Sequence, residues 1–391
     1  MRTAGVIAEF NPFHDGHAYL FRKIRESGCD NIIVVMSGDF VQRGECAICG
    51  KYERTEKALK AGADLVLELP AAAAVGSAQI FAQSAVNILD ALSIVDELWF
   101  GSESGDIAPF ISLGHILTEK EDVYAPAMRQ ALKLGKTFPA ARAEALAKLP
   151  EEDRAGLSSD EILAFLSGPN NILGLEYVRA LLLAKSPIVP KTIVRAGSAY
   201  LDTDAQAFLP SAYALRKAEK EGRSTGSFSQ APLFADDFSL TLMSALLEAD
   251  EASLTSLADI SPELARRILA LAGQVTEFTA FAGLVKTRNM TYTHVSRALV
   301  RIMLGISRAE QDTALAPAAV RLLGLRESPE TSALFAGIKE KGRIRLISSA
   351  KEYHELTGGR DAYAANLYNL VLSAKTGTPF VHEFTRKVVK I

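Results

Sequence analysis

The sequence has few of the features that mark secreted or membrane-bound proteins. It contains three cysteines in 391 residues, and this small, odd number argues against a disulfide framework. It has no run of 18 apolar residues, and its first ten residues lack a basic region followed by an apolar core and a cleavage site. These absences predict a cytoplasmic protein that does not interact with a membrane.

Two of the three cysteines, Cys46 and Cys49, are separated by two residues. Such a pair can hold zinc or form a redox couple, but a zinc site of this kind usually needs a second pair. No second C-x-x-C pair follows. We therefore interpret the pair as incidental and predict no protein-bound metal.

The length and charge of the chain suggest two domains and a polyanionic partner. A chain of 391 residues with 48% hydrophobic and 23% charged residues can bury a large core. Residues 251–391 carry 19 Lys and Arg against 13 Asp and Glu, whereas the first 250 residues carry 24 against 33. A basic second half favours a polyanion, although an ordinary solvated surface explains the charge equally well.

One motif near the N-terminus organises the rest of the sequence. An apolar run at residues 4–10 predicts a first strand, and N-P-F-H-D-G-H at residues 11–17 then breaks it. His14 and His17 therefore stand where a strand leads into a helix. Backbone N–H groups and the positive end of the helix dipole attract anions there, and two imidazoles can donate to phosphate oxygens. The motif predicts a phosphate-binding site.

Strands and helices alternate through the first 100 residues. This order predicts a Rossmann-like parallel sheet, in which ligands bind beyond the carboxyl ends of the strands. Residues 13–17, 37–39 and 101–105 would all lie at that edge. The further predicted strands are residues 31–36, 64–69, 97–100 and 187–196, and the predicted helices are residues 18–25, 51–62, 77–92, 125–134, 138–148 and 160–166.

Four charged residues lie close to this edge in the sequence. Asp39 could orient a ligand hydroxyl or cap the segment that follows it. Arg43, Lys51 and Arg54 are cations near the same edge, and each is interpreted as a solvated charge.

The motif also resembles a known family. H-D-G-H resembles the H-x-G-H signature of the nucleotidyltransferase and class I aminoacyl-tRNA synthetase superfamily. The string at residues 5–20, together with S-G-D-F-V-Q-R-G-E at 37–45, resembles the bacterial tRNA(Met) cytidine acetate ligases. The chain departs from that family at Cys46, where a proline is usual.

The resemblance implies roles for particular residues. His14 and His17 would be catalytic. ATP would contact Ile7, Ala8, Glu9, Phe10, Asn11, Pro12, Phe13, His14, Asp15, Gly16, His17, Ala18, Tyr19 and Leu20, and farther along the chain Gly101, Asn170, Arg195, Ala196, Ser211 and Arg216.

Several of these residues also have structural interpretations. Gly101 could be an ordinary turn after a strand, and Asn170 or Asn171 could cap the helix that runs to residue 184. The segment P-S-A-Y-A-L-R at 210–216 resembles a worn form of the superfamily's second signature, I-S-S-T-x-I-R. It keeps Ser211 and Arg216, but a serine-capped helix is the alternative.

The second half of the chain has mostly helical periodicity. The domains we predict are a catalytic domain at 1–220, with a helical insertion at about 107–185, and a mainly α-helical tRNA-binding domain at 231–391. Within the latter, cations and hydroxyls alternate with aromatic rings, which suits RNA or a polar helix start equally well. The candidate tRNA-binding residues are Lys286, Arg288, Tyr292, His294 and Arg297; the predicted helices are 236–248, 262–271, 275–282, 293–305, 316–323 and 362–374.

The resemblance implies a two-step reaction. Acetate and ATP, with Mg²⁺ accompanying the ATP, would form acetyl-AMP, and the acetyl group would pass to N4 of the wobble cytidine of elongator tRNA(Met). Two alternatives remain open. One is a cofactor adenylyltransferase of the same superfamily, and the other is an RNA-binding module with a vestigial nucleotide site. The sequence leaves the oligomeric state open.

Overall fold

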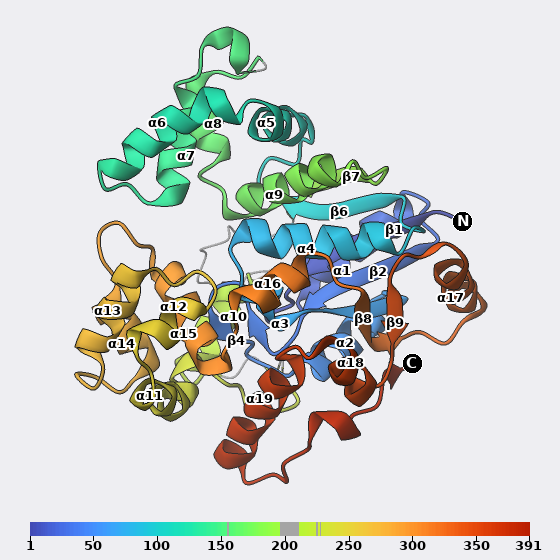
Figure 1. Ribbon diagram of the computed structural model, residues 1–391. Helices are drawn as coiled ribbons and strands as arrows, with labels where there is room; N and C mark the ends of the chain where they lie inside the picture. Colours follow the sequence, from blue (N-terminus) through green and yellow to red (C-terminus); the bar gives the residue numbers. More distant parts are fainter. Residues whose placement is uncertain (155, 196–210, 224–225, 227) are drawn as a thin grey trace.

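The computed structural model describes residues 1–154, 156–195, 211–223, 226 and 228–391. At its centre lies an eight-stranded sheet (Figure 1). Seven strands follow in the order β10-β8-β5-β2-β1-β6-β7, and β9 pairs with β8. Their bounds are β1 (Thr3–Ala8), β2 (Asn31–Ser37), β5 (Leu65–Leu69), β6 (Glu97–Ser102), β7 (Val189–Val194), β8 (Ala319–Leu325), β9 (Arg345–Ile347) and β10 (Val389–Lys390).

The sheet has the predicted Rossmann-like topology. Strands β5, β2, β1, β6 and β7 are all parallel, and only the β5–β8 pair is antiparallel. The chain runs outward from β1 to β5 on one side and from β6 to β7 on the other. The order of strands therefore reverses beside β1, and ligands bind at such a reversal.

Helices cover both faces of the sheet, which explains why the central strands are apolar throughout. In β2, Ile33 and Val35 pack in one core with α4 (Ala78–Ala91), while Ile32 and Val34 pack in a second core with α1 (Asp15–Glu26) and α2 (Lys51–Lys60). Successive side chains of a strand point to opposite faces, so a strand buried on both faces is a continuous hydrophobic run.

Between β6 and β7 the chain forms an insertion made of helices. Its first helices lie at the top of Figure 1, and its last helix packs against α4 and β6. Its elements are α5 (Ala108–Glu119), α6 (Glu121–Lys133), α7 (Phe138–Ala147), η1 (Glu151–Asp153), α8 (Ser159–Phe165) and α9 (Pro169–Ala184).

The rest of the chain is mainly helical, as expected. A group of helices from α11 to α15 lies beside the carboxyl edge of the sheet (Figure 1). The elements are α10 (Ala212–Lys220), η2 (Ala235–Phe238), α11 (Ser239–Leu247), α12 (Glu251–Ser256), α13 (Pro262–Leu271), α14 (Phe278–Val285), α15 (Tyr292–Leu304), α16 (Arg308–Leu315), α17 (Pro329–Lys341), α18 (Ala350–Thr357), α19 (Asp361–Thr376) and η3 (Glu383–Thr385); short elements elsewhere are α3 (Ala71–Ala74), β3 (Phe40–Val41) and β4 (Glu45–Cys46). Within the described ranges, no helix combines the length and the apolar character needed to cross a bilayer.

The helix predicted at residues 316–323 was wrong, because this segment contains most of strand β8. Its run of small and apolar residues fits a buried strand as well as a buried helix, and periodicity alone does not separate the two. Pairing with β5 decides the outcome: Leu67 lies opposite Leu322, and Glu68 lies opposite Arg321. Residues 319–391 therefore return to the sheet and add three strands to it.

The interpretation of Lys51 and Arg54 as solvated charges was also wrong, because both are buried. Lys51 Nζ lies 2.6 Å from Glu68 Oε1 and 2.9 Å from Glu383 Oε1, and Arg321 also pairs with Glu383. This buried network joins β5 and β8 to the C-terminal segment.

Arg54 instead holds the carboxyl ends of two strands. Its Nη1 donates to the carbonyl oxygens of Glu9 (2.7 Å) and Ser37 (3.0 Å). Asp39 accepts a hydrogen bond from the backbone N–H of Lys51 at 2.8 Å, so it caps α2. These contacts fix the backbone from which the candidate site is built.

Candidate active site

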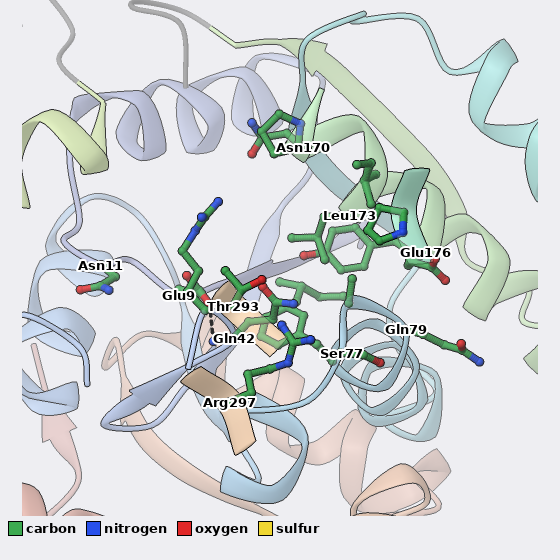
Figure 2. A pocket seen from close by; sticks show the side chains of 18 of the residues that line it. Glu9, Asn11, Gln42, Ser77, Gln79, Asn170, Leu173, Glu176, Thr293 and Arg297 are labelled. Atoms are coloured by element: carbon green, nitrogen blue, oxygen red, sulfur yellow. Dashed lines mark hydrogen bonds between the residues drawn. The ribbon is translucent and has the colours of Figure 1, made fainter. Parts of the chain in front are cut away.

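A cavity of about 1220 Å³ opens at the carboxyl ends of β1 and β6, where the strand order reverses. Its walls come from the ends of these strands, the start of α1, the insertion (α6, α7 and α9) and the segments around α13, α15 and α16. Figure 2 shows side chains from several of these walls. The cavity exceeds the roughly 300–1000 Å³ of most small-molecule pockets, so it has room for more than one ligand.

His14 and His17 both line this cavity and cap the start of α1. His14 Nδ1 accepts from the backbone N–H of Gly16 at 3.0 Å, and His17 Nδ1 accepts from the backbone N–H of His14 at 3.1 Å. The ring centroids are 3.9 Å apart. Because each Nδ1 accepts, each neutral ring carries its proton on Nε2. Both rings therefore keep an Nε2–H donor for a ligand.

Both imidazoles are neutral at pH 7. Burial lowers the pKa of His14 to about 3, and the charges of Arg195 and Arg216 act in the same direction. Burial also puts the pKa of His17 well below its ordinary value, with His14 and Arg195 contributing. Two neutral donors and two cations thus surround the position predicted for a phosphate.

Aromatic packing fixes the orientation of His17. Phe10 has a left-handed backbone with φ of 49°, which is uncommon for a bulky residue. Its ring meets the ring of His17 edge to face, with centroids 4.8 Å apart, and the ring of Phe13 at 5.0 Å. The strained turn after β1 therefore holds the second histidine by packing rather than by a hydrogen bond from a side chain.

Arg195, which directly follows β7, and Arg216 of α10 both line the cavity. The backbone N–H of Arg195 donates to Ser102 O at 3.0 Å, so the β6–β7 pairing continues to this residue. A Cβ at Gly101 would come within 3.0 Å of Arg195 Cγ, and the glycine thus makes room for that side chain. Arg216 donates from Nη1 to the carbonyl oxygen of Asn11.

The prediction that Asn170 or Asn171 caps α9 was wrong. The capping residue is Gly168, and the carboxylate of Glu103 binds the first turn, accepting from the N–H of Asn171 at 2.7 Å and of Asn170 at 3.2 Å. Asn171 holds the 103–104 loop through its Oδ1. Asn170 lines the cavity, where its Nδ2 donates to Glu103 at 2.6 Å.

Ser211 caps α10 by accepting from the N–H of Ala214 at 3.0 Å. It does not line the cavity, whereas Arg216 of the same helix does. The helix cap predicted for Ser211 is thus present, and of the two residues kept from the second signature only Arg216 lies at the cavity wall.

The other residues predicted to contact ATP differ in whether they line the cavity. Asn11 lines the cavity, although its Oδ1 is used to accept from Ile48 N at 2.8 Å. Ala196 lies outside the described residues. Ile7, Ala8, Glu9, Phe10, Gly16, Tyr19 and Leu20 line the cavity; Pro12, Phe13, Asp15 and Ala18 do not.

The candidate tRNA-binding residues lie around the start of α15. Thr291 caps this helix, as expected for a polar helix start. His294 and Arg297 line the cavity, whereas Lys286, Arg288 and Tyr292 do not. Two of the five therefore face the same space as the histidines.

Sequence reasoning missed several polar residues of the cavity. A buried ion pair joins Arg142 of α7 to Glu176 of α9. The two residues are 34 positions apart, and no local sequence pattern predicts their contact. Ser77 caps α4, a role that its position before the helix could have suggested. The others are Gln42, Gln79, Thr137, Asp259, Ser261, Asn289, Thr293, Arg308, Gln311 and Asp312.

In the part of the chain that the structure describes, no three His, Cys, Asp or Glu side chains gather as metal ligands. Cys46 and Cys49 are buried as free thiols, and burial raises the pKa of both, that of Cys49 to about 12. Thiols of this kind are poor nucleophiles and poor metal ligands.

The fold and the histidine pair define a class of protein. A model of the family described as HIGH Nucleotidyl Transferase matches residues 1–380, so the chain belongs to that family.

Comparison with individual relatives narrows the family further. The chain is 34% identical to the tRNA(Met) cytidine acetate ligase of a Thermoanaerobacter species, over 98% of this chain and 99% of that protein. This identity places it in the family of tRNA(Met) cytidine acetate ligases. Two crystal structures of Thermotoga maritima TmcAL, each 28% identical over the full length of both chains, superpose with TM-scores of 0.91 for the apo form and 0.88 for the form bound with alpha-thio ATP.

Proposed function

We propose that the protein is an ATP-dependent ligase that forms acetyl-AMP from acetate and ATP and transfers the acetyl group to N4 of the wobble cytidine of elongator tRNA(Met). The observation that carries this proposal is the pair of neutral imidazoles at the mouth of the sheet, in a chain whose relatives bear that name. The products are N4-acetylcytidine, AMP and pyrophosphate.

In the first step, an acetate oxygen attacks the α-phosphorus of ATP and pyrophosphate leaves. His14 and His17 offer Nε2–H donors to the phosphate oxygens, while Arg195 and Arg216 supply positive charge. These groups act by positioning and by electrostatic stabilisation of the charge that develops on the phosphates. Neutral imidazoles suit this task, since they donate hydrogen bonds and release no proton.

In the second step, the exocyclic amine of cytidine attacks the acetyl carbon of the mixed anhydride. A base inside a stem is out of reach, so the enzyme needs an unpaired base turned into the cavity. The part of the cavity lined by α15 and α16 supports this step, because it adjoins the histidines and belongs to the more basic half of the chain.

We propose that Mg²⁺, where the reaction requires it, is held by the triphosphate, whose oxygens suit this ion. We also propose that the enzyme works in the cytoplasm, where its nucleotide and tRNA substrates are found.

The test is a labelling assay with ATP, [¹⁴C]acetate and separately purified tRNA species. We expect ATP- and acetate-dependent label in elongator tRNA(Met) alone, together with release of AMP and pyrophosphate. Label in no tRNA, with adenylate transferred to a phosphorylated small molecule, would instead identify a cofactor adenylyltransferase. Binding of tRNA without ATP consumption would identify an RNA-binding module.

A further inference from the structure

Glu9 places a carboxylate oxygen without a partner in the cavity. It follows β1 directly, and its Oε1 accepts a hydrogen bond from the backbone N–H of Gln42 at 2.7 Å. Figure 2 shows this bond as a dashed line. Across residues 1–154 and the other described ranges, no hydrogen bond to Oε2 is present, and Glu9 itself lines the cavity. One oxygen is therefore fixed and the other is available.

Arg297 of α15 lines the same cavity as Glu9, and the β3–β4 hairpin that binds Glu9 also packs on this helix. Ser296 Oγ donates to the carbonyl oxygen of Gly44 at 2.6 Å. Gly44, with φ of 76°, packs so tightly that a Cβ there would lie 2.2 Å from Arg297 N. The hairpin that carries Gln42 is thus locked to α15, and Figure 2 shows Glu9, Gln42, Thr293 and Arg297 together in the view.

Arg297 has no compensating carboxylate in contact. Among the residues with described positions, none forms a hydrogen bond or an ion pair within 4.0 Å with its guanidinium, and its buried Nε lacks a partner. Burial lowers the pKa of Arg297 to about 10, with Asp259 opposing the shift. A charged group that is partly buried without a partner indicates a ligand with hydrogen-bond acceptors.

We propose that Glu9 and Arg297 hold the acceptor cytosine, with Glu9 Oε2 accepting from the N4 amine and Arg297 donating to the O2 and N3 edge. This inference rests on the proposed function and names the residues that recognise its second substrate. A carboxylate is the side chain that pairs with the amine of cytosine. The carboxylate repels phosphate, whereas the neighbouring histidines and arginines attract phosphate. These charges therefore favour the cytosine at Glu9 and the triphosphate of ATP at the histidines and arginines.

The same carboxylate takes the proton that the reaction releases. A bond forms between N4 and the acetyl carbon, and the bond from that carbon to the anhydride oxygen breaks. AMP leaves with the electron pair of that bond, and one N4 proton passes to Glu9 Oε2. The products are N4-acetylcytidine, AMP and a protonated Glu9, which returns its proton to water.

The environment of Glu9 suits this role. Burial raises the pKa of its carboxyl, partly offset by the hydrogen bond from the Gln42 backbone and by Arg43 and Arg216, while Glu45 adds to the rise. Other charged or titratable groups that line the same cavity include Tyr177 of α9, the histidine pair of α1, Arg195 and Arg297 of α15. A carboxylate with a raised pKa is a better base than an exposed one.

The experiment separates the two steps in the full-length protein. Acetate-dependent exchange of pyrophosphate into ATP reports acetyl-AMP formation, and a single turnover of preformed acetyl-AMP with elongator tRNA(Met) reports transfer. For Glu9→Gln, we expect the transfer rate to fall about 100-fold or more, in the range of a lost general base, and to fall far more than the exchange rate. The low-pH limb of the wild-type transfer rate should disappear in this variant.

Glu56→Gln is the matched control, because it also removes one negative charge but lies on the exposed side of α2, paired with Lys60. Arg297→Lys should weaken transfer and leave exchange intact. If Glu9→Gln does not fold, Glu9→Asp, which keeps the carboxylate on a shorter side chain, should show the same selective loss to a smaller degree.

Several outcomes would overturn the inference. Equal loss of both steps, a raised KM for ATP or a changed Mg²⁺ dependence of exchange would assign Glu9 to the nucleotide instead. Unchanged transfer in Glu9→Gln would remove it from the reaction. Failure of the proposed function looks different, because the wild-type protein itself would then show no acetate-dependent exchange.

Discussion

The Nδ1 atom of His17 accepts a hydrogen bond from the backbone N–H of His14, 3.1 Å away, and His14 Nδ1 accepts in turn from Gly16. The two residues therefore form a capping box in which imidazoles replace the usual hydroxyl and carboxylate. The same two hydrogen bonds cap the start of the helix and set the tautomer of both rings. The structural and chemical roles of the pair share the same atoms, and suitable substitutions can separate them.

The first prediction separates the cap from the Nε2–H donor. His14→Asn keeps a side chain that caps helices well, whereas His14→Ala loses the cap at a cost of about 1 kcal/mol. Both variants lose the donor. We expect both to form acetyl-AMP about 30- to 1000-fold more slowly, from about 2–4 kcal/mol of lost transition-state stabilisation. Pyrophosphate exchange and thermal melts measure the two effects. A His14→Asn enzyme with wild-type exchange would show that the ring serves only as a cap.

The second prediction concerns stability against pH. The pKa of His14 is about 3 in the folded protein and about 6.5 when unfolded, so the unfolded chain binds more protons between these values. The stability linked to this group is fully present above pH 6.5 and is lost as pH falls towards 3. Urea denaturation at pH 7.5 and pH 5 should show a smaller loss for His14→Asn than for wild type. Equal losses would mean that His14 titrates normally.

The third prediction tests the space beside Arg195. In Gly101→Ala, the new Cβ would meet Arg195 Cγ at 3.0 Å, so the arginine side chain must shift by a few tenths of an ångström at the cavity wall. We expect the KM for ATP in pyrophosphate exchange to rise by about tenfold, with stability nearly unchanged. Gly283→Ala is the control, since it adds a Cβ in open space within α14 and should stabilise the helix by about 0.5–1 kcal/mol. An unaltered KM in Gly101→Ala would show that Arg195 does not depend on this gap.

Local patterns predicted those parts of the fold and site that depend on neighbouring residues. Consecutive residues determine the strand, the break and the helix around His14, and the same is true of the alternating elements up to β6. Strand β8 was missed because its choice of structure depends on pairing with β5, more than 250 residues away.

The same limit applies to individual side chains. Glu103 caps α9 across 67 residues, a contact that the asparagines near that helix concealed. The presence of Arg297 and Glu9 in the same cavity depends on how the hairpin at Gly44 packs on α15, and a sequence of helical periodicity does not specify this packing. Contacts between residues that are distant in sequence decide which side chains line the same cavity. The sequence motifs therefore predicted only the centre of this cavity.

The last prediction concerns the buried network that ties the C-terminal segment to the sheet. Glu383 is fully buried, and its Oε1 lies 2.9 Å from both Lys51 Nζ and the Tyr52 hydroxyl and pairs with Arg321. Removing its charge leaves two buried cations with too little compensation. Loss of one partner of a buried pair typically costs about 3–5 kcal/mol, so we expect Glu383→Gln to lower the free energy of unfolding by that amount.

The control is Glu355→Gln, which removes the same charge from an exposed pair with Lys351 and should change stability by less than about 1 kcal/mol. Urea denaturation midpoints measure both variants. Because the network lies at β5 and β8 and none of its residues lines the cavity, the folded Glu383→Gln protein should keep its pyrophosphate exchange at low temperature. A variant as stable as wild type would show that Glu68 alone neutralises Lys51 and Arg321, and that the C-terminal segment is held to the sheet by apolar packing.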